Sequence, residues 1–215
     1  MMATYDLQEQ EQIEELKTWW QLHGTWITAV VVALAVGVVG WQGWQWWQRG
    51  QATQAGQLYG DLQQSLVQQD AKRVRLLAGE LIEKYSGTAY AGMAAMLAGK
   101  VLADGGDLKS AQAQFGWAAE HAKDPGLRDL ARLRQAIVLA EEGNHDAALQ
   151  RLAVPPAPTF KIRYLEVRGN ILMAQGKSAE ARAAYDEALK LLPADAAASP
   201  YREILEAKRD AGGAA

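Results

Sequence analysis

The sequence predicts an all-α protein, in which a single N-terminal transmembrane helix is followed by a solenoid of three to four helical hairpins. Three observations lead to this fold. First, Asp, Glu, Lys and Arg are absent from Thr18 to Gln48. Second, Ala, Leu, Gln, Glu, Lys and Arg dominate the remainder, where the alternating pattern of β-strands does not occur. Third, a set of small and large residues recurs there at intervals of 37 and then 33 residues.

Residues 1–23 form an acidic amphipathic tail. They contain five carboxylates between Asp6 and Glu15, and Lys17 is their single basic residue. A cleaved secretory signal instead begins with basic residues, and its apolar run ends in small ones. Here the apolar run ends in tryptophans, so we interpret the segment as an uncleaved tail.

Residues 24–47 are predicted to cross the lipid bilayer as one helix. Hydrocarbon offers the backbone no hydrogen-bond partner, and a helix of about 20 apolar residues satisfies its own polar groups across that layer. Indole rings prefer the headgroup layer, and tryptophans flank both ends of the run: Trp19, Trp20, Trp26, Trp41, Trp44, Trp46 and Trp47. Lys17 on one side and Arg49 on the other leave the orientation undecided by charge.

One face of this helix carries mostly small residues. They follow one another at helical spacing and form a candidate transmembrane interface: Ala29, Ala33, Gly37, Gly40 and Trp44. Small residues let two helices approach closely in lipid, where association depends on packing. Ordinary composition is the alternative, because Ala and Gly are common in transmembrane helices.

Composition argues against several classes of function. Residues 48–215 carry 21 basic and 20 acidic side chains, so no basic excess indicates nucleic acid as a partner. The absence of cysteine excludes disulfides, thiolate metal sites and a cysteine nucleophile. His23, His121 and His145 are scattered without metal-ligand spacing, and phosphate-binding or nucleophile-elbow motifs do not occur. We therefore predict no enzyme activity, no catalytic or metal-binding residues and no cofactor.

The recurring pattern lies in residues 92–193. Each unit has a turn glycine, with a small residue seven positions before it, an alanine five after it and a large residue four beyond that alanine. The units are Gly99-Gly106-Ala111-Phe115, Ala136-Gly143-Ala148-Leu152 and Gly169-Gly176-Ala181-Tyr185. Two antiparallel helices approach closely where one offers a small residue to a ring of the other, and glycine ends a helix in a left-handed cap. The pattern resembles the tetratricopeptide (TPR) repeat.

The flanking segments complete the predicted solenoid. Residues 48–91 are expected to form a degenerate hairpin, with helices near 51–68 and 71–85. In the middle repeat, the second helix should be cut short by the proline-rich segment 154–158, since proline cannot continue a helix. Residues 194–215 are expected to hold a C-terminal helix, about Pro200 to Arg209, and a disordered tail from Gly212.

The inner surface of such a superhelix is lined by the first helix of each hairpin. The alignment of the repeats predicts a protein-binding groove of Met93, Met96, Lys100, Leu130, Leu133, Ile137, Arg163, Glu166, Asn170 and Met173. Exposed apolar groups of this kind mark binding surfaces, and methionines adapt to many shapes. Alternatively, the C-terminal helix folds back and covers the groove, with Tyr201, Ile204 and Leu205 as plugs.

Taken together, the chain resembles the YfgM-type ancillary subunit of the Sec translocon. The resemblance rests on the tail ending in Glu15-Leu16-Lys17-Thr18-Trp19-Trp20, the Gly- and Val-rich span leaving through Gly40-Trp41-Gln42-Gly43-Trp44, the segment Lys84-Tyr85-Ser86-Gly87-Thr88-Ala89-Tyr90-Ala91 and the repeat start Val167-Arg168-Gly169-Asn170. It implies a single-pass protein of the bacterial inner membrane, with its N-terminus in the cytoplasm and its TPR-like domain in the periplasm. The implied partners are translocon subunits and a membrane-anchored, prolyl-isomerase-like periplasmic chaperone.

Together with this resemblance, the sequence leads us to expect a membrane-tethered interaction protein that assists secretory proteins as they leave the translocon. A structural adaptor in an envelope assembly or division complex is the alternative.

Overall fold

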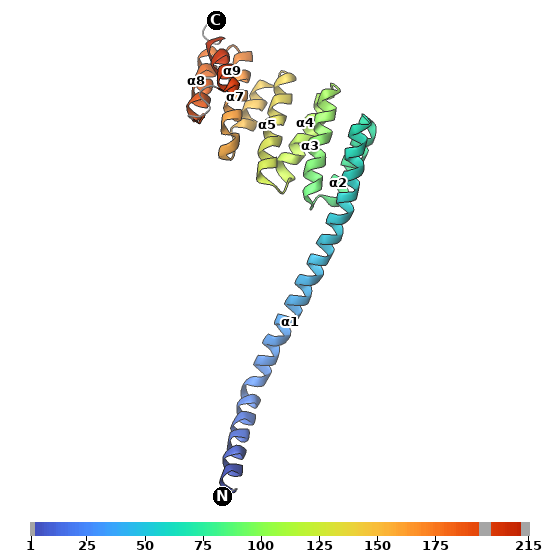
Figure 1. Ribbon diagram of the computed structural model, residues 1–215, viewed down its shortest axis with the longest axis vertical. Coiled ribbons are helices and arrows are strands. Elements are labelled where there is room, and N and C mark those ends of the chain that lie inside the picture. The colour runs from blue at the N-terminus through green and yellow to red at the C-terminus, as the bar shows by residue number, and fades with distance from the viewer. Residues whose placement is uncertain (1–2, 194–198, 212–215) are drawn as a thin grey trace. The chain divides into compact units, whose positions relative to one another are not determined.

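The computed structural model describes residues 3–193 and 199–211, with side chains described from Gln12 onward. This part of the chain is helical and contains no strand, which confirms the all-α prediction. The helices, in chain order, are α1 (Ala3–Val67), α2 (Ala71–Tyr85), α3 (Ala89–Asp104), α4 (Leu108–His121), α5 (Pro125–Glu141), α6 (His145–Leu152), α7 (Pro158–Ala174), α8 (Ser178–Leu191) and α9 (Pro200–Ala211) (Figure 1). The chain divides into two compact units, residues 1–50 and 51–215.

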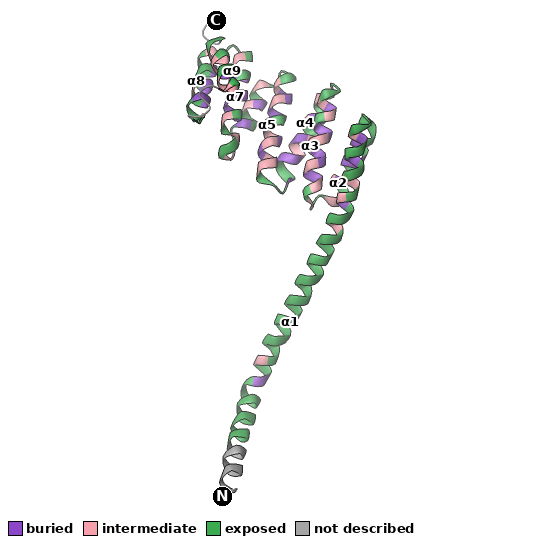
Figure 2. Cartoon of the chain, in the orientation of Figure 1, coloured by how far each residue is buried: buried purple, intermediate pink, exposed green. Residues whose placement is uncertain are grey.

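The first unit consists of one helix, the N-terminal part of α1. The predicted tail and the predicted span are continuous within it, because no Pro interrupts the run and Gly is tolerated in membrane helices. From Gln12 to Gly50 its Trp, Val and Leu side chains are exposed, as the green colour of most of this stretch in Figure 2 shows. Among the described residues, α1 is the one helix long and apolar enough to cross a membrane. An exposed apolar surface of this extent on a helix of this length is typical of a membrane anchor.

Polar side chains within this stretch bond to their own helix. The hydroxyl of Thr28 donates to the carbonyl of Gly24 (2.7 Å), and that of Thr18 donates to the carbonyl of Glu14 (2.8 Å). The indole of Trp20 lies over Gly24 and buries it. The two hydroxyls are therefore paired without a partner chain, as a membrane helix requires.

The second unit begins with a hairpin made by the end of α1 and by α2. Its bounds agree with the helices expected near 51–68 and 71–85, although the first of these is the end of the long α1. Leu62 packs against Leu77 and Leu81 in a core that also receives α3. Asp70 begins α2 by accepting a hydrogen bond from the backbone N–H of Arg73 (3.0 Å).

Three further hairpins follow, α3–α4, α5–α6 and α7–α8. Their turns contain the predicted glycines Gly106, Gly143 and Gly176, with φ of +79°, +81° and +76°. At each turn the backbone N–H of the residue after the glycine donates a hydrogen bond to a carbonyl in the last turn of the preceding helix, for example from Asp107 to Leu102 (2.9 Å). This hydrogen bond is part of the Schellman motif. The motif favours glycine because a residue with a Cβ is strained at positive φ.

The repeat pattern also sets how closely the helices of a hairpin approach. A Cβ added to Gly99 would lie 2.7 Å from the ring of Phe115, and one added to Gly169 would lie 2.5 Å from the ring of Tyr185. The rings therefore occupy the space that the glycines leave open, as the sequence predicted. Tyr185 donates from its hydroxyl to the side-chain oxygen of Asn170 (2.9 Å), which fixes the ring in this position.

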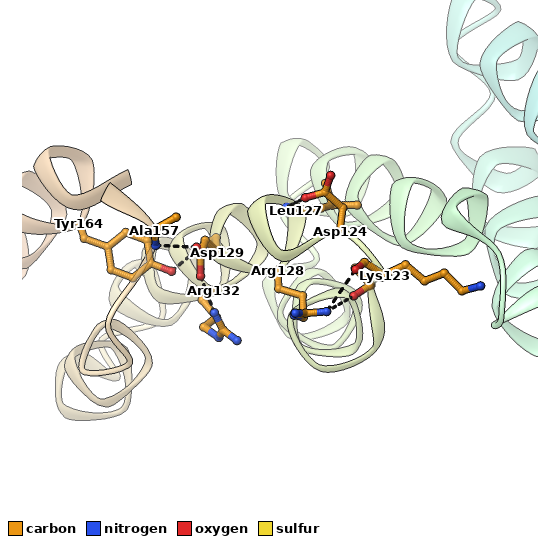
Figure 3. Close-up of polar contacts among 9 residues, drawn as sticks. Lys123, Asp124, Leu127, Arg128, Asp129, Arg132, Ala157 and Tyr164 are labelled. Atoms are coloured by element: carbon orange, nitrogen blue, oxygen red, sulfur yellow. Dashed lines mark hydrogen bonds and ion pairs between the residues drawn. The ribbon is translucent and has the colours of Figure 1, made fainter. Parts of the chain in front are cut away.

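The middle repeat departs from its neighbours as expected. Its second helix, α6, has 8 residues and ends before the proline-rich segment. Asp129 of α5 holds that segment by accepting a hydrogen bond from the backbone N–H of Ala157 (2.9 Å), and its backbone carbonyl accepts one from the hydroxyl of Tyr164 (2.7 Å) (Figure 3). A carboxylate on α5 thus fixes where α7 begins.

Candidate functional site

A groove runs between α3 and α5, the first helices of two neighbouring hairpins. It encloses about 420 Å³ and contains four of the predicted binding residues, Met96, Lys100, Leu130 and Ile137. These residues meet because α3 and α5 lie in contact along the solenoid. Phe115 and Val138 complete its apolar floor.

A second cavity of about 560 Å³ extends this groove toward the first hairpin. It lies between the α1–α2 turn, with Leu66 and Val74, and the end of α3. Leu97, Lys100 and Asp104 line both cavities, so the two adjoin one another along α3. Sequence reasoning missed this extension because residues 48–91 show no repeat pattern from which a face could be assigned.

Charges lie at the edges of the groove. Lys100 and Asp104 form an ion pair at 2.5 Å along one turn of α3. Arg134 and Glu141 stand on α5, and neither has a hydrogen-bond or ion-pair partner among the described residues. An apolar floor with a mixed-charge rim is typical of surfaces that bind protein segments.

Two predicted groove residues of the first two repeats lie elsewhere. Leu133 is 4% exposed and packs with Tyr164 and Val167, so its assignment to an open groove is wrong. The difference follows from helix geometry. Leu133, three residues after Leu130, points toward α7, whereas Ile137, seven residues after Leu130, returns to the face that lines the groove. Met93 is half-buried and lines neither cavity.

In the third repeat, α9 covers the predicted groove. Glu166 of α7 is 3% exposed and accepts hydrogen bonds from the hydroxyl of Tyr201 (2.8 Å) and the ammonium of Lys208 (2.5 Å). Arg163 forms an ion pair with the same carboxylate. Leu205 is fully buried in the core cluster that also contains Leu165 and Tyr185. Glu166 is therefore an anchor for α9, and its assignment to an open binding surface is corrected.

The alternative in which the C-terminal helix folds back and covers the groove therefore holds for the third repeat. In contrast, α9 does not line the groove between α3 and α5. Tyr201 and Leu205 act as plugs, whereas Ile204 is 49% exposed, so its expected role as a plug is wrong. Met173 is partly buried beside the cluster that holds Leu205. Asn170 is occupied by the hydroxyl of Tyr185, described above.

Electrostatics at this anchor favour the ionised carboxylate. Burial alone raises the pKa of Glu166, but hydrogen bonds from Lys208 and Tyr201 together with the charge of Arg163 outweigh burial and hold the pKa below its ordinary value. Burial and the neighbouring Glu166 raise the pKa of Tyr201 to about 12. The phenol therefore remains a hydrogen-bond donor at neutral pH.

The candidate transmembrane interface is exposed along its length. Ala29, Ala33, Gly37, Gly40 and Trp44 all lie on the surface of α1. A Cβ added to Gly37 or Gly40 would meet no atom within 4 Å. The stripe is therefore free to contact lipid or another helix.

Among the described residues, no cluster of His, Asp and Glu has the arrangement of a metal site. The fold and the groove define a class of protein: a helical-hairpin repeat protein that is anchored in a membrane by an N-terminal helix and that presents an apolar groove.

Comparisons with known proteins identify the family. The model of the tetratricopeptide repeat-like domain family matches residues 17–214. A protein of Neisseria gonorrhoeae named ancillary SecYEG translocon subunit is 28% identical over 206 residues, covering 95% of this chain and 97% of the relative. A protein of Haemophilus influenzae with the same name is 30% identical over 184 residues, covering 86% of this chain and 90% of the relative. The chain belongs to the family of TPR-like proteins that includes these ancillary translocon subunits, which confirms the resemblance seen in the sequence.

Proposed function

We propose that this chain is a non-enzymatic adaptor of the Sec translocon, whose groove holds apolar segments of unfolded secretory proteins. It acts together with a membrane-anchored, prolyl-isomerase-like periplasmic chaperone. Residues 1–23 lie in the cytoplasm, and the repeats lie in the periplasm. The name shared by both relatives supports the association with the translocon. The observation that carries the role of the repeats is the groove between α3 and α5 together with the adjoining cavity along α3.

The chemistry of the groove suits varied, apolar chain segments. Its floor offers unbranched Met96 and branched Leu130 and Ile137, and flexible thioether side chains adjust to many shapes. Lys100 and Asp104 are already paired with one another, so an apolar segment that covers this turn of α3 leaves neither of these two charges unpaired. Such a surface binds without demanding one sequence, as a protein serving many secretory chains requires.

Site-specific photocrosslinking tests this proposal. A photoreactive amino acid replaces Leu130 in the groove, and a matched variant carries it at Ala113, an exposed position of α4. Both full-length variants are expressed in cells whose membranes contain translocons occupied by an arrested secretory chain. We expect adducts with the secretory chain or the chaperone from position 130 and few from position 113.

Equal adduct yields from positions 130 and 113 contradict a role for the groove. Adducts from position 130 with envelope-assembly or division proteins, in place of secretory chains, support the structural adaptor and overturn the proposal.

The small-residue face of α1 is proposed to contact a membrane subunit of the translocon. In the variant with both Gly37→Leu and Gly40→Leu, larger side chains separate the helices, so copurification of translocon subunits should fall while membrane insertion stays normal. Ala35→Leu is the control, because this exposed residue lies on the opposite face of the helix from the stripe. Unchanged copurification in the double variant shows that the stripe faces lipid.

A further inference from the structure

A separate polar cavity of about 330 Å³ lies between α4, α5 and α6. It is lined by Arg128, Arg132 and Gln135 of α5, by Arg151 of α6 and by Glu120 of α4. It shares no lining residue with the apolar groove. Spacings of four and three residues place Arg128, Arg132 and Gln135 on one face of α5.

The fold holds two of the guanidinium groups in place. Nη1 of Arg128 donates to the carbonyl of Ala122 at the end of α4 (2.7 Å), and Nη1 of Arg132 donates to the carboxylate of Asp129 (2.6 Å) (Figure 3). Asp129 is itself fixed by the N–H of Ala157. Each of these contacts uses one nitrogen of a group that has five N–H donors. The arginines are therefore pre-positioned with donor capacity remaining.

Arg151 adds a third positive charge at the cavity. This side chain is exposed, and it has no hydrogen-bond or ion-pair partner within the described part of the chain. The cavity lining therefore carries three guanidinium groups against the carboxylate of Glu120, and the carboxylate of Asp129 neutralises a further charge through its ion pair with Arg132, which leaves an excess of one positive charge. The excess favours a ligand with one negative charge, and guanidinium groups bind planar carboxylates in bidentate fashion.

Gln135 indicates a second requirement of the ligand. It is 3% exposed, and its Oε1 accepts no hydrogen bond from any described residue. The amide fits here because position 116 is glycine: a Cβ at Gly116 would lie 2.7 Å from Nε2 of Gln135. A buried acceptor without a donor destabilises the protein, so a ligand N–H at this place removes a penalty.

From these contacts we infer that the cavity binds a peptide carboxylate together with a neighbouring N–H of the same peptide. The arginines hold the carboxylate, and Oε1 of Gln135 accepts the N–H. Both a chain terminus and an acidic side chain provide this pair of groups. Inorganic phosphate provides the charge without the N–H.

Arginine side-chain NMR of the full-length chain in detergent micelles tests the inference. N-Acetylglycine presents a terminal carboxylate, and the α-amide of N-acetylaspartate presents a side-chain carboxylate. N-Acetylglycinamide, acetate and inorganic phosphate are the comparison probes. We expect saturable shifts of the Nε–Hε signals of Arg128 and Arg132 with one or both peptide carboxylates, and which of the two binds more tightly identifies the source. N-Acetylglycinamide should produce no such shifts.

Variants then separate the roles of the side chains. Arg151→Gln should weaken binding of the carboxylate probe by about tenfold or more, because it removes a charge-assisted hydrogen bond. Gln135→Leu should abolish the advantage of N-acetylglycine over acetate. Arg134→Gln is the matched control on α5, because Arg134 lines the apolar groove instead. Thermal melts of each variant report its folding. Because Arg151 is exposed, its substitution should leave the fold intact, so Arg151→Gln tests the inference even where Gln135→Leu perturbs the fold.

Three results overturn the inference. These are equal shifts with the neutral amide, tighter binding of phosphate than of either carboxylate, and unchanged affinity in the Arg151→Gln variant.

Discussion

The hydroxyl of Tyr201 donates a 2.8 Å hydrogen bond to the carboxylate of Glu166, a residue 35 positions earlier in the chain. With the ion pair between Lys208 and the same carboxylate, this contact fastens α9 onto α7. The last helix therefore closes the third repeat, and the groove between α3 and α5 stays accessible. The packing of α9 onto the third repeat therefore depends on this anchor.

Removing the hydroxyl should loosen α9. Tyr201→Phe keeps the ring in place but removes a hydrogen bond to an ionised group, so the free energy of unfolding should fall by about 1.5–3 kcal/mol. Urea unfolding of the full chain in detergent micelles measures this value. Ile204→Ala, at an exposed position of α9, is the control and should change little. Equal losses in both variants mean that the hydrogen bond does not anchor the helix.

The anchor should also make the protein sensitive to acid. Because the pKa of Glu166 in the folded state lies below its ordinary value of 4.5, the ionised carboxylate stabilises the fold. That stabilisation is complete above about pH 4.5 and is lost as the pH falls through the folded pKa. Glu166→Gln should therefore be less stable than the parent at pH 7, and the difference should narrow toward pH 3. A difference that stays constant across this range contradicts the assignment.

Glycines at close contacts should tolerate no side chain. In Gly169→Ala the new methyl group meets the buried ring of Tyr185, so we expect a loss of about 1–3 kcal/mol in the free energy of unfolding. Gly79→Ala is the matched control within α2, where an added Cβ meets nothing within 4 Å. That change should stabilise the protein by about 0.5–1 kcal/mol, since alanine favours helix more than glycine does. Circular dichroism melts should show shifts of opposite sign.

Two neighbouring apolar residues on α5 should respond differently to a charge. Ile137→Glu places a carboxylate at a partly buried position that borders the groove, so the fold should survive while crosslinking from position 130 to the partner is lost. Leu133→Glu buries an unpaired carboxylate in the core, so its melting temperature should fall sharply. Comparing the melt and the crosslinking yield of both variants distinguishes surface from core. A folded Ile137→Glu variant that still crosslinks fully contradicts binding in the groove.

The orientation in the membrane is open to a direct test. An alkaline phosphatase fused after Gly212 should be active, because the enzyme folds in the periplasm when the repeats lie there. Protease added to spheroplasts should then remove the repeats and leave residues 1–23 protected. An inactive fusion together with protected repeats reverses the proposed topology.

Local features of the sequence determined most of the fold. Three predicted features are present in the structure: the helix over the long uncharged run, the turn glycines at positive φ, and the close pairs Gly99–Phe115 and Gly169–Tyr185. Each depends on residues close in sequence, where helix geometry fixes distance and direction. The short α6 was predictable for the same reason, because proline acts on its own turn.

Only the tertiary structure decided which apolar residues face the groove and which belong to the core. Leu133 and Ile137 look alike in the sequence, but the packing of α7 against α5 buries the first, while the second stays at the groove. The role of Glu166 depends on Lys208, 42 residues away, and that of Asp129 depends on Ala157, 28 residues away. A charged residue in a helix is ordinarily a solvated one, and its burial becomes evident only when distant partners satisfy it.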